Sequence, residues 1–152
     1  MLQEIYLVSA CLLGANCRYN GTSSKINELD NLVDSGRLIA ICPEVLGGLK
    51  TPREACEISL QRDGNIKVMS HEGLDCTIEF QTGAKRVLDI AKVCGVKKAI
   101  LKANSPSCGC GYVYDGTFTG KLIEGSGLTS QLLLENGIEV YNEDNWDKGE
   151  FI

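Results

Sequence analysis

Four short apolar runs, each closed by turn-forming residues, dominate the pattern of this sequence. They lie at residues 5–9, 38–41, 97–101 and 138–141. Segments with helical spacing of apolar residues separate them, at 26–33, 77–93 and 126–136, and glycines follow these segments. Apolar strands that alternate with helices are typical of a parallel sheet buried on both faces. We therefore expect an α/β fold: a single compact domain over residues 1–152, with a mostly parallel, Rossmann-like sheet flanked by helices on both faces.

Two short β-hairpins are expected as additions to this sheet. The runs 56–60 and 65–70 flank Arg62-Asp63-Gly64, and the runs 112–114 and 117–119 flank Asp115-Gly116. Asp-Gly is a strong signal for the tight turn of a hairpin. The segment 43–52, which contains the pair Gly47-Gly48, is expected to be a loop.

The charge balance limits the class of partner. Lys and Arg number 15 against 20 Asp and Glu, which gives a net charge of −5. Binding to extended nucleic acid is therefore not expected, and tRNA is a less favoured substrate than a small molecule, because phosphate contacts require Lys and Arg. No apolar run reaches the 18 or more residues of a transmembrane helix. Glu4, without any Lys or Arg beside it, precedes the first apolar run and argues against an export signal. We expect a cytoplasmic protein, monomeric or a small homo-oligomer, with reduced thiols.

Three of the eight cysteines stand at equivalent places in the predicted sheet. Cys11 follows the first strand, Cys42 follows the second, and Cys108 lies in the loop after the third. Because the carboxyl ends of parallel strands share one edge of a sheet, where ligands bind, these thiols are predicted to converge.

Three converging thiolates suit a soft metal, either Zn²⁺ or an iron–sulfur cluster. The sequence has no C-x-x-C pair and a single histidine, His71, which is expected on the surface of the first hairpin. A cubane held by three cysteines leaves one iron open as a Lewis acid. No Rossmann dinucleotide fingerprint is present, since Gly109-Cys110-Gly111 precedes a hairpin and not a helix.

The other cysteines receive different predictions. Cys94 lies on the apolar side of the long predicted helix and is expected to be buried. Cys56 and Cys76 are expected to be core or half-exposed residues. Cys17 and Cys110 are loop thiols that could reach the site, and Cys108-x-Cys110 is the closest pair available for thiol redox chemistry.

Three motifs together resemble the thiouracil desulfidase family, once catalogued as a domain of unknown function. They are Ser9-Ala-Cys-Leu-Leu-Gly14, Cys42-Pro-Glu-Val-Leu-Gly-Gly-Leu49 with Pro52-Arg53, and Ser105-Pro-Ser-Cys-Gly109 with Tyr114-Asp-Gly-Thr-Phe-Thr-Gly120. The resemblance implies a [4Fe–4S] cluster held by three cysteines with one open iron. It implies replacement of the sulfur of a thiolated pyrimidine base, nucleoside or nucleotide by oxygen, without net redox change.

Carried over by position, the resemblance makes Cys11, Cys42 and Cys108 the cluster ligands. It makes Glu44 and Ser105 the catalytic residues, with Glu44 suited to general acid or base work. Two hypotheses of other classes remain beside this one. The first is a non-catalytic thiol-metal module, an iron–sulfur carrier or zinc-stabilised binding domain, and the second is a thiol redox enzyme.

Overall fold

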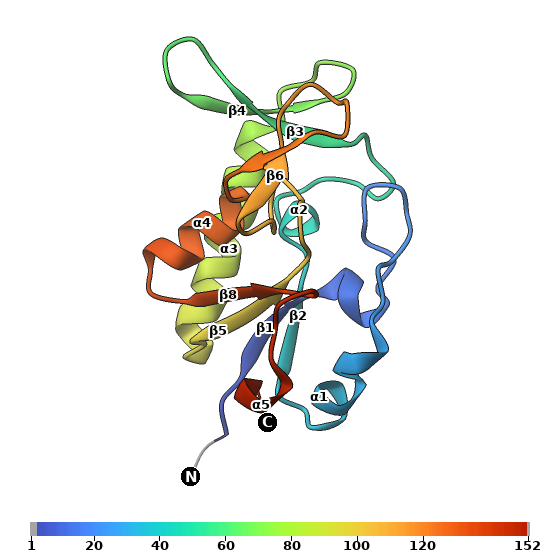
Figure 1. Cartoon of the computed structure of the whole chain (residues 1–152), viewed down its shortest axis with the longest axis vertical. Helices are drawn as coiled ribbons and strands as arrows, with labels where there is room; N and C mark the ends of the chain where they lie inside the picture. The colour runs from blue at the N-terminus through green and yellow to red at the C-terminus, as the bar shows by residue number, and fades with distance from the viewer. Residues whose placement is uncertain (1–2, 152) are drawn as a thin grey trace.

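A four-stranded sheet forms the centre of the computed structural model, which describes residues 3–151 (Figure 1). All its strands run parallel in the order β2-β1-β5-β8, and each lies within one residue of its predicted position. Their bounds are β1 Tyr6–Ser9, β2 Leu38–Ile41, β5 Lys98–Leu101 and β8 Glu139–Asn142. The chain leaves β1 toward β2 on one side and later enters β5 on the other. The carboxyl ends of β1 and β5 therefore flank the point where strand order reverses, the usual ligand site of such sheets.

Side chains of the central strands alternate between two apolar clusters. Leu7, Ala99 and Leu101 pack with the residues of α3 (Thr77–Cys94) and α4 (Leu128–Glu135). Tyr6, Val8 and Ile100 belong to the second cluster, on the opposite face. This alternation follows from the two-residue period of a strand, and it confirms the expectation of a sheet covered on both faces.

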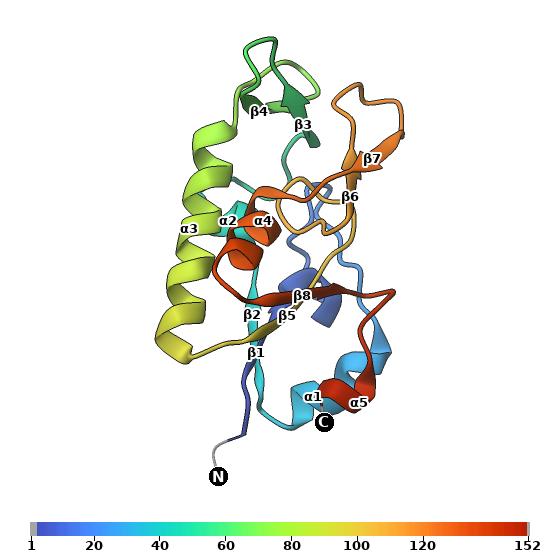
Figure 2. The same cartoon turned by 60° about the vertical axis from the view of Figure 1, so that its left-hand side comes forward.

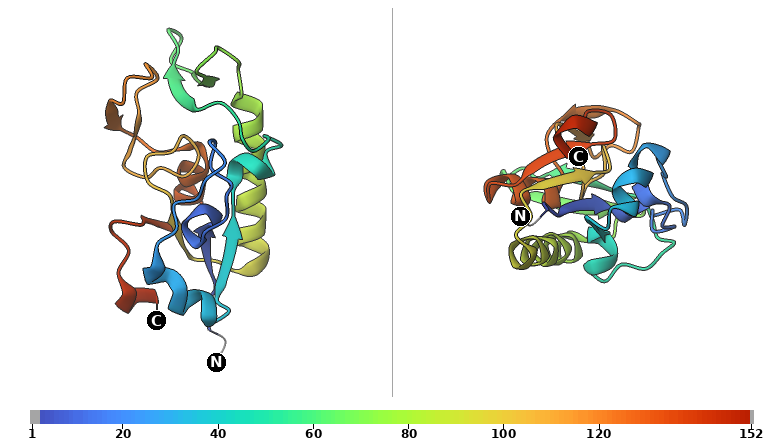
Figure 3. Two further views of the ribbon diagram at one scale, coloured as in Figure 1. Left: turned by 90° about the vertical axis from the view of Figure 1, so that its right-hand side faces the viewer. Right: turned by 90° about the horizontal axis from the view of Figure 1, so that it is seen from below.

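Short helices cover the second face. They are the 3₁₀ helices η1 (Ala10–Leu13) and η2 (Asn27–Leu29) with α1 (Asp30–Asp34) and α5 (Lys148–Phe151). Viewed from below, the strands lie between α3 on one side and α1 and α5 on the other (Figure 3). In α5, the fully buried Phe151 packs edge-to-face against the ring of Tyr6, with the ring centroids 4.7 Å apart. No helix within residues 3–151 has the length and apolar character needed to span a lipid bilayer.

Two antiparallel hairpins stand above the carboxyl edge of the sheet (Figure 1). The first pairs β3 (Cys56–Leu60) with β4 (Ile66–Ser70), as predicted. The second joins β6 (Tyr112–Tyr114) to β7 (Leu122–Glu124), so the prediction of 117–119 as its second strand is wrong. That segment lies in a longer connection because the backbone N–H groups of Gly116 and Phe118 both donate to the Glu57 carboxylate, at 3.0 and 3.1 Å.

The segment after β2 also differs from the prediction, because it begins with a short helix, α2 (Pro43–Leu46). Pro43 occupies the first turn, where its missing N–H costs nothing. The backbones of α2 and α3 meet where Gly47 and Gly83 face each other. A Cβ on Gly83 would lie 1.9 Å from the Pro43 carbonyl oxygen, and a Cβ on Gly47 would lie 2.0 Å from that of Glu79. α3 therefore fixes the position of α2.

Cys94 is exposed, and the prediction of its burial is wrong. Gly95 ends α3 in a left-handed conformation, with φ 68°, and turns the chain back toward β5. The buried stripe of α3 reaches only Ala91, and burial resumes at Val96. α3 packs beside α4 along this stripe (Figure 2).

The close contact of α2 with α3 predicts the effect of Gly83→Ala. Alanine is favoured over glycine in a helix by up to about 1 kcal/mol. Here its methyl group would overlap the Pro43 carbonyl, so we expect the free energy of unfolding to fall by about 1–3 kcal/mol. Urea denaturation measures this change. Gln81→Ala, at an exposed site of the same helix, is the control and should stay within about 0.5 kcal/mol of wild type. A Gly83→Ala variant as stable as wild type would contradict the packing described.

Candidate active site

One pocket lies between the carboxyl edge of the sheet and the two hairpins. Its volume is about 400 Å³, within the range of about 300–1,000 Å³ typical of small-molecule sites. Cys11, Cys42 and Cys108 all line it, together with Glu44 and Ser105. The structure therefore brings together all five residues selected from the sequence.

Cys11 and Cys42 take their positions directly from strand ends. Cys11 lies in η1, immediately beyond β1, and its carbonyl accepts the N–H of Ser24 at 2.9 Å. Gly14 ends this turn with φ 105°, a conformation that glycine adopts without strain. Cys42 is the residue between β2 and α2.

The loop that carries Cys108 is held by the N-terminus of α4. The N–H groups of Leu128 and Thr129 donate to the carbonyls of Pro106 and Ser107, each at 2.9 Å. The hydroxyl of Ser130 donates to the Cys108 carbonyl at 2.6 Å. The first N–H groups of a helix lack partners within it, so here they fix a loop.

Two of the three thiols are deeply buried, and burial determines their protonation. It raises the pKa of Cys108 to about 12. It raises that of Cys11 to about 12 as well, with further contributions from the neighbouring Cys108, Cys17 and Cys42. Such thiols are neutral at physiological pH unless a cation stabilises their thiolates. Metal binding would supply that cation and release the protons.

The donors at this pocket are of the type that soft metal centres require. Thiolates bind Zn²⁺ and also hold the irons of iron–sulfur clusters. Within the described residues, no group of three His, Cys, Asp or Glu side chains is arranged to hold a single metal ion. Three free thiols around one pocket are the donor type that such clusters take from proteins.

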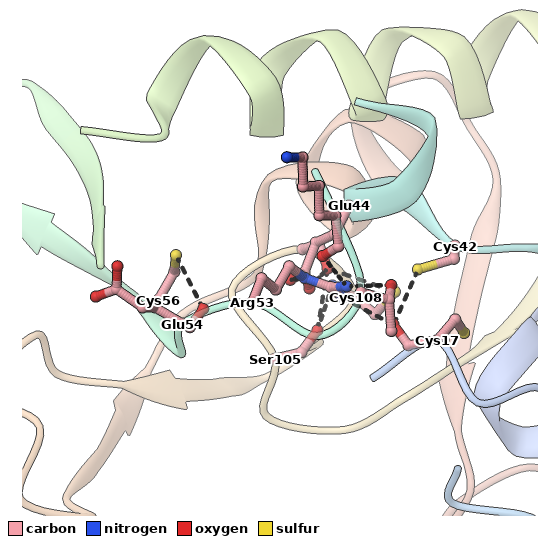
Figure 4. Close-up of polar contacts among 11 residues, drawn as sticks. Cys17, Cys42, Glu44, Arg53, Glu54, Cys56, Ser105 and Cys108 are labelled. Atoms are coloured by element: carbon pink, nitrogen blue, oxygen red, sulfur yellow. Dashed lines mark hydrogen bonds and ion pairs between the residues drawn. The ribbon is translucent and has the colours of Figure 1, made fainter. Parts of the chain in front are cut away.

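Glu44 is held by a partly buried ion pair (Figure 4). Its Oε1 accepts a hydrogen bond from Nε of Arg53 at 3.1 Å, and the side chains of Arg53 and Glu44 are only 8% and 14% exposed. Arg53 also donates to the Cys17 carbonyl at 2.9 Å. These bonds fix the carboxylate beside the thiols, in a position suited to proton transfer.

A row of hydroxyl groups leads to Glu44. The Ser107 hydroxyl donates to Oε2 of Glu44 at 2.8 Å, and the oxygens of Ser105 and Ser107 are 3.3 Å apart. Ser105 Oγ accepts the N–H of Cys108 at 2.7 Å, which leaves its own proton free to point elsewhere. Ser105 and Ser107 therefore connect the pocket to the carboxylate.

Two serines of this site are missing from the sequence prediction. Ser9 Oγ donates to Cys108 Sγ at 3.3 Å and accepts the N–H of Lys102 at 2.8 Å. Ser107 Oγ lies 3.8 Å from the same sulfur. Both belong to the motifs noted in the sequence, but only the fold shows that their hydroxyls face a thiol.

The remaining cysteines and His71 differ in their position relative to the pocket. Cys17 lines the pocket and Cys56 does too, on the other side of the ion pair in Figure 4. Cys56 and Cys76 are half-buried, as expected. Cys110 is absent from the pocket lining among the described residues, and its Sγ lies 4.0 Å from the Val140 carbonyl. His71 is exposed, as predicted, but it also lies at the pocket.

The fold and site thus define a class: an α/β protein with a small-molecule pocket whose thiols suit a soft-metal centre. The family model of 2-thiouracil desulfurase matches residues 6–145. The chain is 43% identical over 143 residues to YbbK of Bacillus subtilis (strain 168), an uncharacterized protein, covering 91% of this chain and 95% of YbbK. The solved structure of the [4Fe–4S]-dependent thiouracil desulfidase TudS (DUF523Vcz) is similar, with TM-score 0.88, 44% identity, and coverage of 98% of this chain and 95% of that one. This chain belongs to the 2-thiouracil desulfurase family, which confirms the resemblance predicted from its motifs.

The partly buried ion pair predicts a measurable effect of Arg53→Met. The substitution removes the charged partner of the Glu44 carboxylate, so we expect the free energy of unfolding to fall by about 1–3 kcal/mol. Urea denaturation of Arg53→Met and of the double variant Arg53→Met/Glu44→Gln measures it, and the second change should restore part of the loss. A loss of less than about 1 kcal/mol, as for an exposed pair, would contradict the role given to Arg53.

Proposed function

We propose that this chain is a thiouracil desulfidase. It exchanges the sulfur of a C=S group for oxygen: 2-thiouracil and water give uracil and hydrogen sulfide, without net oxidation or reduction. The observation that carries the proposal is the pocket in which three thiols from three strand ends meet Glu44 and Ser105. Membership of the 2-thiouracil desulfurase family supports it, as does the similarity to TudS.

The cofactor in this proposal is a [4Fe–4S] cluster held by Cys11, Cys42 and Cys108, with one iron free of any protein ligand. When bound, such a cluster supplies a soft Lewis acid that favours sulfur and makes the thiocarbonyl carbon more electrophilic. Ser9, whose hydroxyl donates to the Cys108 sulfur at 3.3 Å, would stabilise its thiolate form.

Glu44 is the proposed base. The attacking water must lose a proton, and the row of Ser105, Ser107 and Glu44 offers it a path toward the carboxylate. Arg53 keeps one carboxylate oxygen occupied, so the other oxygen, bonded to Ser107, is the one that accepts the proton. Ser105 orients the water, since its oxygen already accepts from the Cys108 N–H. The same carboxyl group can return the proton to the departing sulfide.

The substrate is proposed to be a small thiolated pyrimidine, as base, nucleoside or nucleotide. A pocket of about 400 Å³ is within the range of small-molecule sites, about 300–1,000 Å³. The net charge of −5 gives no general attraction for a polynucleotide backbone, so tRNA is the less favoured form.

The proposed ligands predict which cysteines the cluster requires. After anaerobic reconstitution, iron and acid-labile sulfide should reach about four of each per wild-type chain. Cys11→Ala, Cys42→Ala and Cys108→Ala should each lose most of both. Cys94→Ala is the matched control, because Cys94 is an exposed free thiol, and it should bind as much as wild type. Full cluster content in all three ligand variants would contradict the assignment. A cluster in a wild-type chain that leaves 2-thiouracil unchanged would favour the non-catalytic thiol-metal module instead.

The proton path predicts that catalysis can fail while the cluster stays bound. Glu44→Gln and Ser105→Ala should each lower kcat for 2-thiouracil by about 10²–10⁴-fold, the usual contribution of a general acid or base. Sulfide release measures the rate, and iron content and the absorption spectrum serve as controls. A kcat within about twofold of wild type in Glu44→Gln would contradict the proposed base.

A further inference from the structure

The two hairpins bring a pair of aromatic rings to the pocket, and neither ring has a role in the chemistry proposed above. His71 follows β4, and Phe118 lies in the connection between β6 and β7. Both line the pocket. Their centroids are 5.1 Å apart with the ring planes at 83°, an edge-to-face contact. We call His71 and Phe118 the aromatic pair.

The backbone at Phe118 is held in an unfavourable conformation. Its φ is 58°, in the left-handed region that residues other than glycine, asparagine and aspartate rarely adopt. A bulky residue persists there only where surrounding contacts impose the conformation. Packing alone does not require an aromatic ring here, because an aliphatic side chain could cover the same apolar surface. A ring held in a strained backbone conformation indicates a functional role.

Glu57 on β3 imposes that conformation. Glu57 is only 8% exposed. Its Oε1 accepts hydrogen bonds from the N–H groups of Gly116 and Phe118, at 3.0 and 3.1 Å. No Lys, Arg or His within residues 3–151 forms an ion pair with it. The two backbone N–H groups offset part of the cost of desolvating this buried carboxylate. Glu57 thus ties one hairpin to the other and fixes the aromatic pair.

The position of the pair suits recognition of a planar ring. The hairpins stand above the carboxyl edge of the sheet (Figure 1), and residues of both hairpins line the pocket that also contains the three thiols. Heteroaromatic rings gain binding free energy by stacking on, or meeting the edge of, aromatic side chains. A substrate whose sulfur points to the thiols would place its ring toward the hairpins.

We propose that the aromatic pair binds the pyrimidine ring of the substrate and selects for planar heteroaromatic thiocarbonyl compounds. Phe118 and His71 are the ring-contacting residues, and Glu57 is a positioning residue that acts through the backbone of Phe118. The identity of the ring rests on the proposed function.

Binding of uracil, the product, tests the pair without relying on turnover. Calorimetric titration of the cluster-loaded protein with uracil should show about 5- to 150-fold weaker binding in Phe118→Leu, the range found for removal of one stacking side chain. KM for 2-thiouracil should rise by a similar factor, with a smaller change in kcat and unchanged iron content. Phe118→Tyr should bind nearly as well as wild type. Tyr112→Leu removes an exposed aromatic ring outside the pocket on the same hairpin and should have no effect.

Two more variants keep the test decisive if Phe118→Leu fails to fold. His71→Ala changes an exposed residue and should weaken uracil binding in the same direction. Glu57→Gln retains an acceptor for both N–H groups and should bind better than Glu57→Ala, with the difference in KM and not in kcat. Wild-type protein that binds uracil, with Phe118→Leu and His71→Ala binding it equally well, would overturn the aromatic pair alone. Wild-type protein that neither binds uracil nor converts 2-thiouracil would overturn the proposed function and the pair with it.

Discussion

Parallel strand order is the constraint on which this site depends. Because β1, β2 and β5 all run in one direction, residues distant in sequence that follow them share one edge of the sheet. Cys11, Cys42 and Cys108 meet there without any local cysteine motif. The helix α4 fixes the loop that carries Cys108, and the contact between Gly47 and Gly83 fixes the short helix α2 that carries Glu44. Residues of the two hairpins line the pocket from the other side.

Burial gives the site its chemical character. Thiols as buried as Cys11 and Cys108 remain protonated alone, and a metal centre offsets the cost of their ionisation. The same low-polarity surroundings strengthen the ion pair between Glu44 and Arg53, which keeps the carboxylate in place. In the proposed mechanism, the site would combine a soft Lewis acid for sulfur with a fixed proton acceptor for water. Those are the two functions that exchange of sulfur for oxygen requires.

Much of the fold could be predicted because its signals are local and periodic. The four apolar strands, the long helix ending at Gly95 and the first hairpin each follow from the spacing of their own residues. α2 has only four residues, too few for a periodic pattern, and it depends on α3 packing against it. The prediction of a strand at 117–119 was wrong for a similar reason. The Asp-Gly signal is local, whereas the backbone of this segment is held by Glu57, which is distant in sequence. Cys94 fits the apolar periodicity of the long helix, but a side chain is buried only where another element packs against it.

For the site, the positions of the strand ends predicted that the three thiols would meet. The contacts of Ser9 and Ser107 depend on side-chain directions, which the spacing of residues in the sequence does not encode.

The proposed mechanism depends on an iron with no protein ligand, open to the sulfur of a thiocarbonyl. Mössbauer spectroscopy of protein reconstituted anaerobically with ⁵⁷Fe, recorded with and without 2-thiouracil, observes that iron. We predict that about one quarter of the iron signal, one site of a four-iron cluster, changes its parameters when 2-thiouracil is added, while the rest stays as it was. A cluster whose irons all remain unchanged at saturating 2-thiouracil, or iron that never assembles into a four-iron cluster, would contradict it.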